Sequence, residues 1–209
     1  MPTPLAFGVF LSAAILLAIT PGPGIFYVLA RSLKGGWRDG IASSMGTALG
    51  GMVHVCAAAL GLSAILATSA LAFSIVKYAG AAYLIYLGLR ALIAGHSVAE
   101  TVNVPAESTA RILLQGMLTE VLNPKTALFF LAFIPQFINP SGSIVIQFIV
   151  LGSISVVLNT SVDVIVALFS GPIGYTLRNN ARFRHGQQLF TGGALVILGV
   201  YVALADDTH

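Results

Sequence analysis

The sequence predicts an all-α polytopic membrane protein of about six transmembrane helices, arranged as two inverted three-helix repeats with helices 1 and 4 broken at proline. Three observations predict it. Of the 209 residues, 57% are hydrophobic and only 8% are charged, and the mean hydropathy is +0.94; a soluble domain has about 25% charged residues. The apolar stretches are continuous and not alternating, which argues against a β-barrel. Prolines interrupt apolar stretches at corresponding places in the two halves.

The apolar stretches are long enough to cross a bilayer, which takes about 20 residues in a helix. They are Leu5–Ala30, Ile41–Ala67, Ala70–Ile93, Ile112–Ile138, Ile144–Phe169 and Leu189–Ala205. The last is the shortest, so a five-span alternative stays open. No basic segment precedes the first stretch, and helix breakers stand where a cleavage site would be expected. We therefore expect a retained span and no ordinary signal peptide.

Lysine and arginine gather in alternate connections between the predicted spans. The connections 1–2, 3–4 and 5–6 hold or adjoin all the basic residues of the loops, whereas Thr68–Ser69 and Asn139–Ser143 hold none. The basic residues are Arg31, Lys34, Arg38, Arg90, Arg111, Arg178, Arg182 and Arg184. The positive-inside rule places these connections in the cytoplasm and both termini outside. Like the other basic residues of these connections, Arg31 is interpreted mainly as a signal of which side of the membrane its connection lies on.

A polar connection at residues 94–111 divides a single transmembrane transporter domain, residues 1–209, into half-repeats of about 1–93 and 112–205. The first helix of each half carries a similar element, TPGPGIFY at residues 20–27 and NPKTALFF at residues 123–130. In both, a small polar residue precedes proline and aromatic residues follow. Because each half has an odd number of spans, the halves take opposite orientations, as in secondary transporters. The alternative is chance similarity between two apolar segments.

The two breaks predict a polar site near the middle of the membrane. Proline removes a backbone hydrogen bond, and the freed groups need a partner that is not lipid. A half-helix restarts after each break, and its N-terminus attracts an anion such as a substrate carboxylate. The candidate binding residues are Pro21, Gly22, Pro23, Gly24, Asn123, Pro124, Lys125 and Asn159. The alternatives are a packing kink at Pro21 and Pro23 and a structural ion pair of Lys125 with Glu120.

Few ionisable residues fall inside the predicted spans, and such residues are functional candidates because burying them is costly. Glu120, Asp163 and His54 are the candidates for proton coupling. Asp163 ends a polar stripe with Ser155 and Asn159 on one helix face, which predicts a cavity lining. The alternative for Asp163 is a hydrated residue near the inner surface.

His54 lies on a face with Gly46 and Gly50, which predicts a close contact between helices. For His54 a hydrogen bond to a neighbouring helix is therefore the alternative to a role in proton transfer. Lys77 is expected to extend its ammonium toward the outer surface. Glycine-lined faces of this kind also allow a homodimer.

Three motifs together resemble the LysE/RhtB family of bacterial amino-acid exporters. They are the PGP of the first helix, NPKTALFFLAFIPQF at residues 123–137 and KYAGAAYLIYLGLRAL at residues 77–92. The resemblance implies a multi-pass exporter of amino acids or close derivatives, such as threonine, homoserine or its lactone, in the cytoplasmic membrane. It also implies that the proton-motive force drives export. The motif residues carried over are Pro21, Gly22, Pro23, Asn123, Pro124 and Lys125.

Other functions have less support in the sequence. It has no phosphate-binding G-x-x-x-x-G-K-[ST] loop, so an ion gradient is the expected energy source. We find no H-E-x-x-H or G-x-S-x-G motif, and His54 alone does not make a catalytic metal site. No cofactor, metal or nucleic-acid partner is expected; the partners are the lipid bilayer and a small-molecule substrate. A membrane channel and a membrane-embedded enzyme remain the alternatives.

Overall fold

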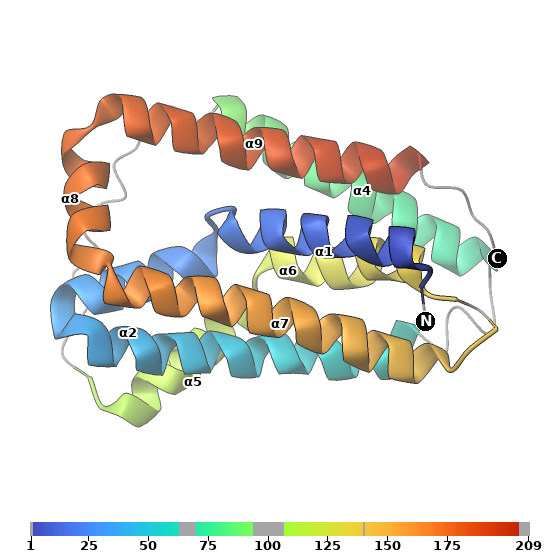
Figure 1. Cartoon of the computed structure of the whole chain (residues 1–209), viewed down its shortest axis with the longest axis horizontal. Helices are drawn as coiled ribbons and strands as arrows, with labels where there is room; N and C mark the ends of the chain where they lie inside the picture. The colour runs from blue at the N-terminus through green and yellow to red at the C-terminus, as the bar shows by residue number, and fades with distance from the viewer. Residues whose placement is uncertain (1, 63–69, 94–106, 140, 205–209) are drawn as a thin grey trace.

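A computed structural model describes residues 2–62, 70–93, 107–139 and 141–204, and these residues contain helices and connections without a strand. The helices run in the order shown in Figure 1. They are α1 Pro4–Ile19, α2 Pro23–Ala57, η1 Ala58–Leu62, α4 Ala70–Ile93, α5 Thr109–Val121, α6 Pro124–Leu128, η2 Phe129–Phe133, η3 Ile134–Phe137, α7 Ile144–Leu168, α8 Ser170–Asn179 and α9 Ala181–Leu204. η1 and η2 are π-helical and η3 is a 3₁₀-helix. The predicted all-α class is confirmed.

The first predicted stretch is broken where the prolines predict it. α1 ends at Ile19 and α2 begins at Pro23. α2 then reverses at Gly36, whose φ of 79° lies in the left-handed region that favours glycine. The reversal divides α2 into a first arm, residues 23–35, and a second arm, residues 37–57. α1 with the first arm corresponds to the first predicted stretch, and the second arm with η1 to the second.

The fourth predicted stretch is also broken at proline. α5 ends at Val121, and the chain restarts at Pro124 after a bend of 48°. Among the described residues, four helices are long and apolar enough to cross a membrane, with Pro23–Gly61 counted as one across the reversal. The bent pair makes a fifth, whereas α1 alone is shorter. The last stretch is longer than predicted because α9 begins at Ala181 rather than near Leu189. The predicted 5–6 connection contains the helix α8.

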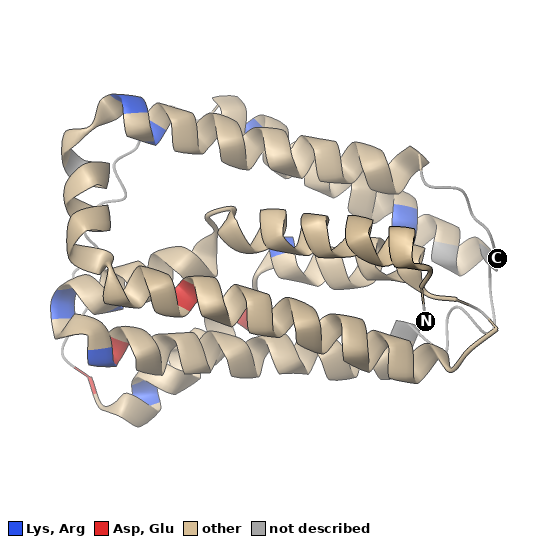
Figure 2. Cartoon of the chain, in the orientation of Figure 1, with Lys and Arg blue, Asp and Glu red and all other residues tan. Residues whose placement is uncertain are grey.

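The helices form two packed groups with the broken segments between them. α2 packs against α5 and α7, while α4 packs against α9. Figure 1 shows α1 and α6 in the middle, between α9 with α4 on one side and α7 with α2 on the other. Figure 2 shows most Lys and Arg positions near α8, the reversal of α2 and the start of α9, at the end opposite the start of α1. Residues 63–69, which include the predicted connection Thr68–Ser69, and residues 94–106 of the predicted connection 94–111 lie outside the described residues.

Aromatic side chains fill the core between the breaks and the end of the molecule where α1 starts. Phe129 and Phe133 stack with ring centroids 4.9 Å apart, and Phe133 and Phe137 lie 4.8 Å apart. Phe10 of α1 packs edge-on against Phe137 at 5.6 Å. These rings are buried, so the half-helix after Pro124 is anchored to α1 on the side away from the basic residues.

Candidate functional site

The break after α1 leaves backbone carbonyls that lysine satisfies. Pro21 has no N–H, so it cannot donate to the carbonyl of Leu17 one turn earlier. The Lys125 ammonium donates to this oxygen at 3.1 Å and to the carbonyl oxygen of Thr20 at 2.9 Å. The Lys125 residue is only 6% exposed. A lysine from the second half therefore replaces the hydrogen bond that a proline removes in the first half.

The break after α5 has a matching arrangement. Pro124 cannot donate to the carbonyl of Glu120, again one turn earlier. His54 Nε2 lies 3.0 Å from this oxygen, which also accepts from the Asn123 N–H. Since a carbonyl only accepts, Nε2 carries the proton in this bond. The imidazole also stacks on the Phe130 ring, with centroids 5.7 Å apart. The predicted bond of His54 to a neighbouring helix is confirmed.

A close approach of α2 to α5 allows His54 to reach that carbonyl. A Cβ atom added at Gly50 would lie 2.6 Å from the Met117 carbonyl oxygen and 2.7 Å from Glu120 Cβ. Any larger residue at this position would separate the two helices. The glycine face predicted from the sequence therefore packs against α5, which brings α2 within hydrogen-bond distance of the second break.

Glu120 is buried beside both breaks. Its residue is 1% exposed, and its two carboxylate oxygens accept from Thr126 Oγ1 at 2.6 Å and from Asn123 Nδ2 at 3.0 Å. Lys125 donates to carbonyls of α1 and not to this carboxylate. The alternative of a Lys125–Glu120 ion pair is therefore wrong for this structure.

The N-termini of both half-helices have partners within the chain. A Cβ atom at Gly24 would lie 2.8 Å from Glu120 Oε2, so the first turn of α2 adjoins a carboxylate that its dipole favours. At α6, the Asn123 side chain accepts from the Lys125 N–H at 3.1 Å. Gly22 adjoins the Lys125 side chain. A carboxylate therefore lies beside the first half-helix end and an asparagine side chain caps the second, and the binding of a substrate carboxylate at these ends stays a prediction.

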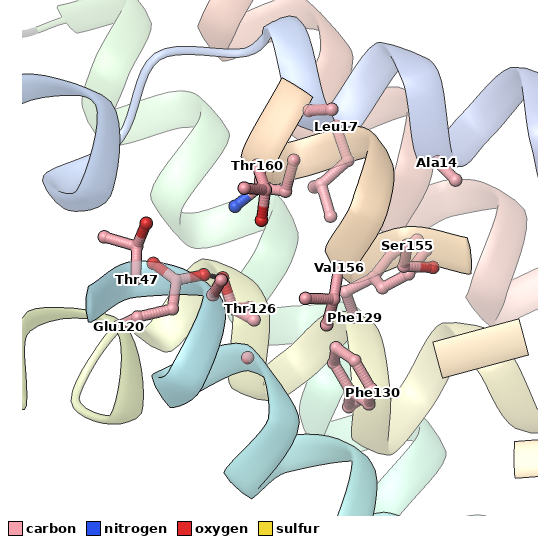
Figure 3. A pocket seen from close by; sticks show the side chains of 14 residues that line it. Ala14, Leu17, Thr47, Glu120, Thr126, Phe129, Phe130, Ser155, Val156 and Thr160 are labelled. Carbon is pink, nitrogen blue, oxygen red and sulfur yellow. Dashed lines mark hydrogen bonds between the residues drawn. The ribbon is translucent and has the colours of Figure 1, made fainter. Parts of the chain in front are cut away.

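A small pocket lies between the broken helices and α7. It is partly open to the surface and has a cavity volume of about 20 Å³, which is room for about one water molecule. Its polar lining residues are Thr47, Glu120, Thr126, Ser155, Asn159 and Thr160, and its apolar ones are Ala14, Leu17, Ala18, Ala48, Gly51, Phe129, Phe130 and Val156. Figure 3 shows Thr47, Glu120 and Thr126 together on one side, with Phe130 and Val156 on the other.

The pocket includes only part of the predicted set of site residues. Glu120 and Asn159 line it, with Ser155 of the predicted polar stripe. The other predicted residues are not among its lining: Pro21, Gly22, Pro23, Gly24, Asn123, Pro124, Lys125, His54 and Asp163. Five other lining residues were not predicted as site residues from the sequence: Thr47, Thr126, Thr160, Phe129 and Phe130. Thr126 follows Pro124 by two residues, so the break itself was a signal for it.

Asp163 is buried next to the pocket. Its residue is 0% exposed, so the alternative of a hydrated residue near the inner surface is wrong. Its Oδ2 accepts from Thr47 Oγ1 at 2.7 Å, and Thr47 lines the pocket. Oδ1 is buried and has no hydrogen-bond partner among the described residues. A carboxylate in this state binds a proton or another cation favourably.

Two basic residues differ from their predicted roles. Lys77 is 1% exposed, with its ammonium 5.2 Å from the Tyr78 ring centroid, so it does not extend to the surface as expected. Arg31 is 3% exposed and forms an ion pair with Glu107 at 3.2 Å. Arg31 also donates to Gln115, which connects the first arm of α2 to α5. Glu107 was missed because it stands in the predicted polar connection.

Among the described residues, no group of three or more His, Cys, Asp or Glu side chains lies close enough to hold a metal ion. The chain is similar over residues 15–206 to the family described as LysE type translocator. It is 29% identical over 196 residues to the homoserine/homoserine lactone efflux protein of Salmonella typhimurium, covering 94% of this chain and 95% of that protein.

Two further relatives show the same likeness. The chain is 32% identical over 207 residues to an uncharacterized membrane protein of Bacillus subtilis, covering 94% of this chain and 97% of the relative. It is 33% identical over 140 residues to the leucine efflux protein of Salmonella typhimurium, covering 65% and 64% of the two chains. No solved structure matches the chain.

Proposed function

The chain belongs to the LysE type translocator family, and we propose that it exports amino acids or close derivatives across the bacterial cytoplasmic membrane. It is a multi-pass membrane protein and a transporter, not an enzyme. The efflux proteins for homoserine, its lactone and leucine among its relatives support an amino-acid substrate. The observation that carries the proposal is the family match over residues 15–206, in a chain with a pocket between its broken helices that polar and apolar residues line.

We propose that six spans form two inverted three-helix repeats, residues 1–93 and 112–205. The pairing of the helices supports this proposal: α4 packs on α9, and Val156 of α7 adjoins Gly51 in the second arm of α2. Each proline break also receives a basic donor from the opposite half. Under this topology, the end rich in Lys and Arg is cytoplasmic and both chain ends are outside.

The pocket is the proposed substrate site. Its polar side offers the Glu120 carboxylate to a substrate ammonium, because a carboxylate accepts more hydrogen bonds than the two that it has here. Asn159 is available to the substrate carboxylate, and Phe129 and Phe130 to an apolar side chain. Gly22, Gly24 and Lys125 shape this site from outside the lining. A pocket polar on one side and apolar on the other suits a neutral zwitterion.

Proton coupling is proposed to involve Asp163, next to the substrate site. Of the predicted candidates, Glu120 has donors on both carboxylate oxygens and His54 bonds a carbonyl, whereas Asp163 has one free oxygen. Thr47 contacts Asp163 and lines the pocket, which connects the two sites. Substrate binding and protonation of Asp163 are therefore able to influence each other through one hydroxyl.

The function is tested with purified protein in liposomes. An imposed pH difference should drive labelled homoserine, threonine or leucine against its own gradient, with saturation kinetics. A channel would give non-saturating flux that does not depend on the pH difference. Expression in an exporter-deficient strain that is challenged with each amino acid would identify the substrate. Failure to move any amino acid in either assay would contradict the proposal.

The coupling role is tested by Asp163→Asn, which keeps the size of the side chain but cannot lose or gain the proton. We expect this variant to lose accumulation driven by the pH difference while it retains exchange of labelled for unlabelled substrate. Ser161→Ala, which removes an exposed hydroxyl from the same helix outside the pocket lining, is the matched control and should keep coupled transport. Coupled accumulation by Asp163→Asn at the wild-type level would show that the proton is carried elsewhere.

A further inference from the structure

We propose that the Lys125 ammonium is a built-in cation, which occupies a monovalent-cation site formed by the carbonyl end of α1. The site consists of the carbonyl oxygens of Leu17 and Thr20, 3.1 Å and 2.9 Å from the ammonium nitrogen. The effect on export rests on the function proposed above, whereas occupancy of the site is independent of it.

The backbone explains why this end of α1 attracts a cation. Pro21 has no N–H to donate to the Leu17 carbonyl, which keeps only the N–H of Thr20 at 3.1 Å, and the Thr20 carbonyl lies past the end of α1. The same carbonyls carry the negative end of the helix dipole. In transporters with broken helices, unwound carbonyls and the C-terminal ends of half-helices coordinate the coupling cations. In this chain a lysine stands at such a place.

The surroundings of the lysine show that its position is specific. The residue is 6% exposed, so its ammonium is not solvated as a surface lysine would be. A Cβ atom at Gly22 would lie 3.3 Å from Lys125 Cε and 3.4 Å from Nζ, so the glycine leaves room for the ammonium. The buried charge is compensated by two carbonyl dipoles and by the helix end, with Glu120 engaged elsewhere.

At the break before α6, ordinary hydrogen bonds satisfy the carbonyl that the proline leaves without its helical donor. At Pro124 the freed carbonyl of Glu120 receives one imidazole N–H and one backbone N–H. A single carbonyl is involved there, whereas at α1 the Thr20 N–H donates to the Leu17 carbonyl but not to the second carbonyl of the site. At α1 two carbonyls converge on one charged group. The two breaks therefore differ in a testable way: removal of Lys125 leaves a cation site, and removal of His54 leaves only a missing donor.

Chemical rescue by methylammonium tests the proposal. The full chain is purified in detergent as wild type, Lys125→Ala and His54→Ala, and its melting temperature is measured with methylammonium chloride and with tetramethylammonium chloride. Methylammonium should raise the melting temperature of Lys125→Ala in a saturable manner, because a ligand that binds only the folded state stabilises it. Tetramethylammonium, which has no N–H, should have no effect. The wild type and His54→Ala should respond to neither salt.

A folded Lys125→Ala that does not respond to methylammonium, or a His54→Ala that responds equally, would overturn the proposal. If Lys125→Ala does not fold, the export rates of Lys125→Arg and Lys125→Gln test the proposal instead. The cation site predicts that the arginine variant keeps export within about tenfold of wild type and that the neutral glutamine variant loses more. Equal export by these two variants overturns it. A wild type that exports no amino acid would refute the proposed function while the thermal test still stands.

Discussion

At both proline breaks a basic side chain from the opposite half bonds backbone carbonyls, but the side chain and the number of carbonyls differ. At the first break, a charged lysine from the second half bonds two carbonyls of α1. At the second, a histidine from the first half bonds one carbonyl of α5, which an adjacent backbone N–H also reaches. Each half therefore supplies a donor that the proline of the other half has removed. The difference teaches that each break in this chain is tolerated because the opposite half supplies a donor, a lysine where two carbonyls converge and a histidine where one carbonyl is bonded.

The largest expected effect comes from removing the charged donor. Lys125→Met removes the ammonium from two buried carbonyls, of which that of Leu17 keeps the Thr20 N–H as a donor. Hydrogen bonds to charged groups contribute about 1.5–3 kcal/mol each. We therefore expect a loss of about 3 kcal/mol or more in the free energy of unfolding, measured by equilibrium unfolding in mixed micelles. His54→Leu is the matched variant at the other break and should cost about 1 kcal/mol, since the Asn123 N–H still serves the same oxygen. Equal costs for the two variants would show that the breaks are energetically alike.

The positions of the breaks were predictable from the sequence, whereas their partners were not. Pro21 and Pro124 determine where helices end, because a missing N–H is a local property of the chain. The bond from Lys125 to Leu17 spans 108 residues, and that from His54 to Glu120 spans 66. Such long-range pairs depend on how the helices pack, so the sequence indicated Lys125 and His54 as candidates but assigned Lys125 to an anion.

Part of the pocket was missed for a similar reason. The stripe of Ser155 and Asn159 follows from helical spacing alone, and both residues line the pocket. Thr47 is one of several hydroxyl residues in an apolar helix, and only the packing of α2 against α7 brings it to Asp163. The apolar side, with Phe129 and Phe130, resembles any membrane helix in composition. The sequence therefore predicted the charged and polar residues of the site better than its shape.

The two glycines that follow Pro21 and Pro23 differ in the side chain that each of them adjoins. A methyl group at Gly24 would lie 2.8 Å from Glu120 Oε2, whereas one at Gly22 would lie 3.3 Å from the flexible Lys125 side chain. Gly24→Ala should therefore displace the carboxylate that lines the pocket. We expect it to lower export about tenfold, which corresponds to about 1.4 kcal/mol. Gly22→Ala should have a smaller effect because lysine methylenes adjust more easily. Initial export rates in liposomes at matched protein levels would measure both.

The opposite order of these two variants would show that Lys125, rather than Glu120, is the side chain most sensitive to displacement at the site. Melting temperatures of both variants serve as the control for folding. A Gly24→Ala variant that exports at the wild-type rate would place the substrate away from Glu120.

The smallest expected effect concerns the hydrogen bond of His54, which replaces the backbone hydrogen bond that Pro124 removes. If His54 compensates for Pro124, restoring the backbone N–H with Pro124→Ala should make the imidazole less important. His54→Leu should then cost about 1 kcal/mol in the wild-type background and less in the Pro124→Ala background. Pro21→Ala is the matched control, because it restores a donor at the other break and should leave the cost of His54→Leu unchanged. Unfolding free energies of the four variants of each cycle give the coupling. A cost of His54→Leu that is the same in all three backgrounds would mean that the imidazole acts through its stacking on Phe130 and not through the carbonyl that the proline leaves free.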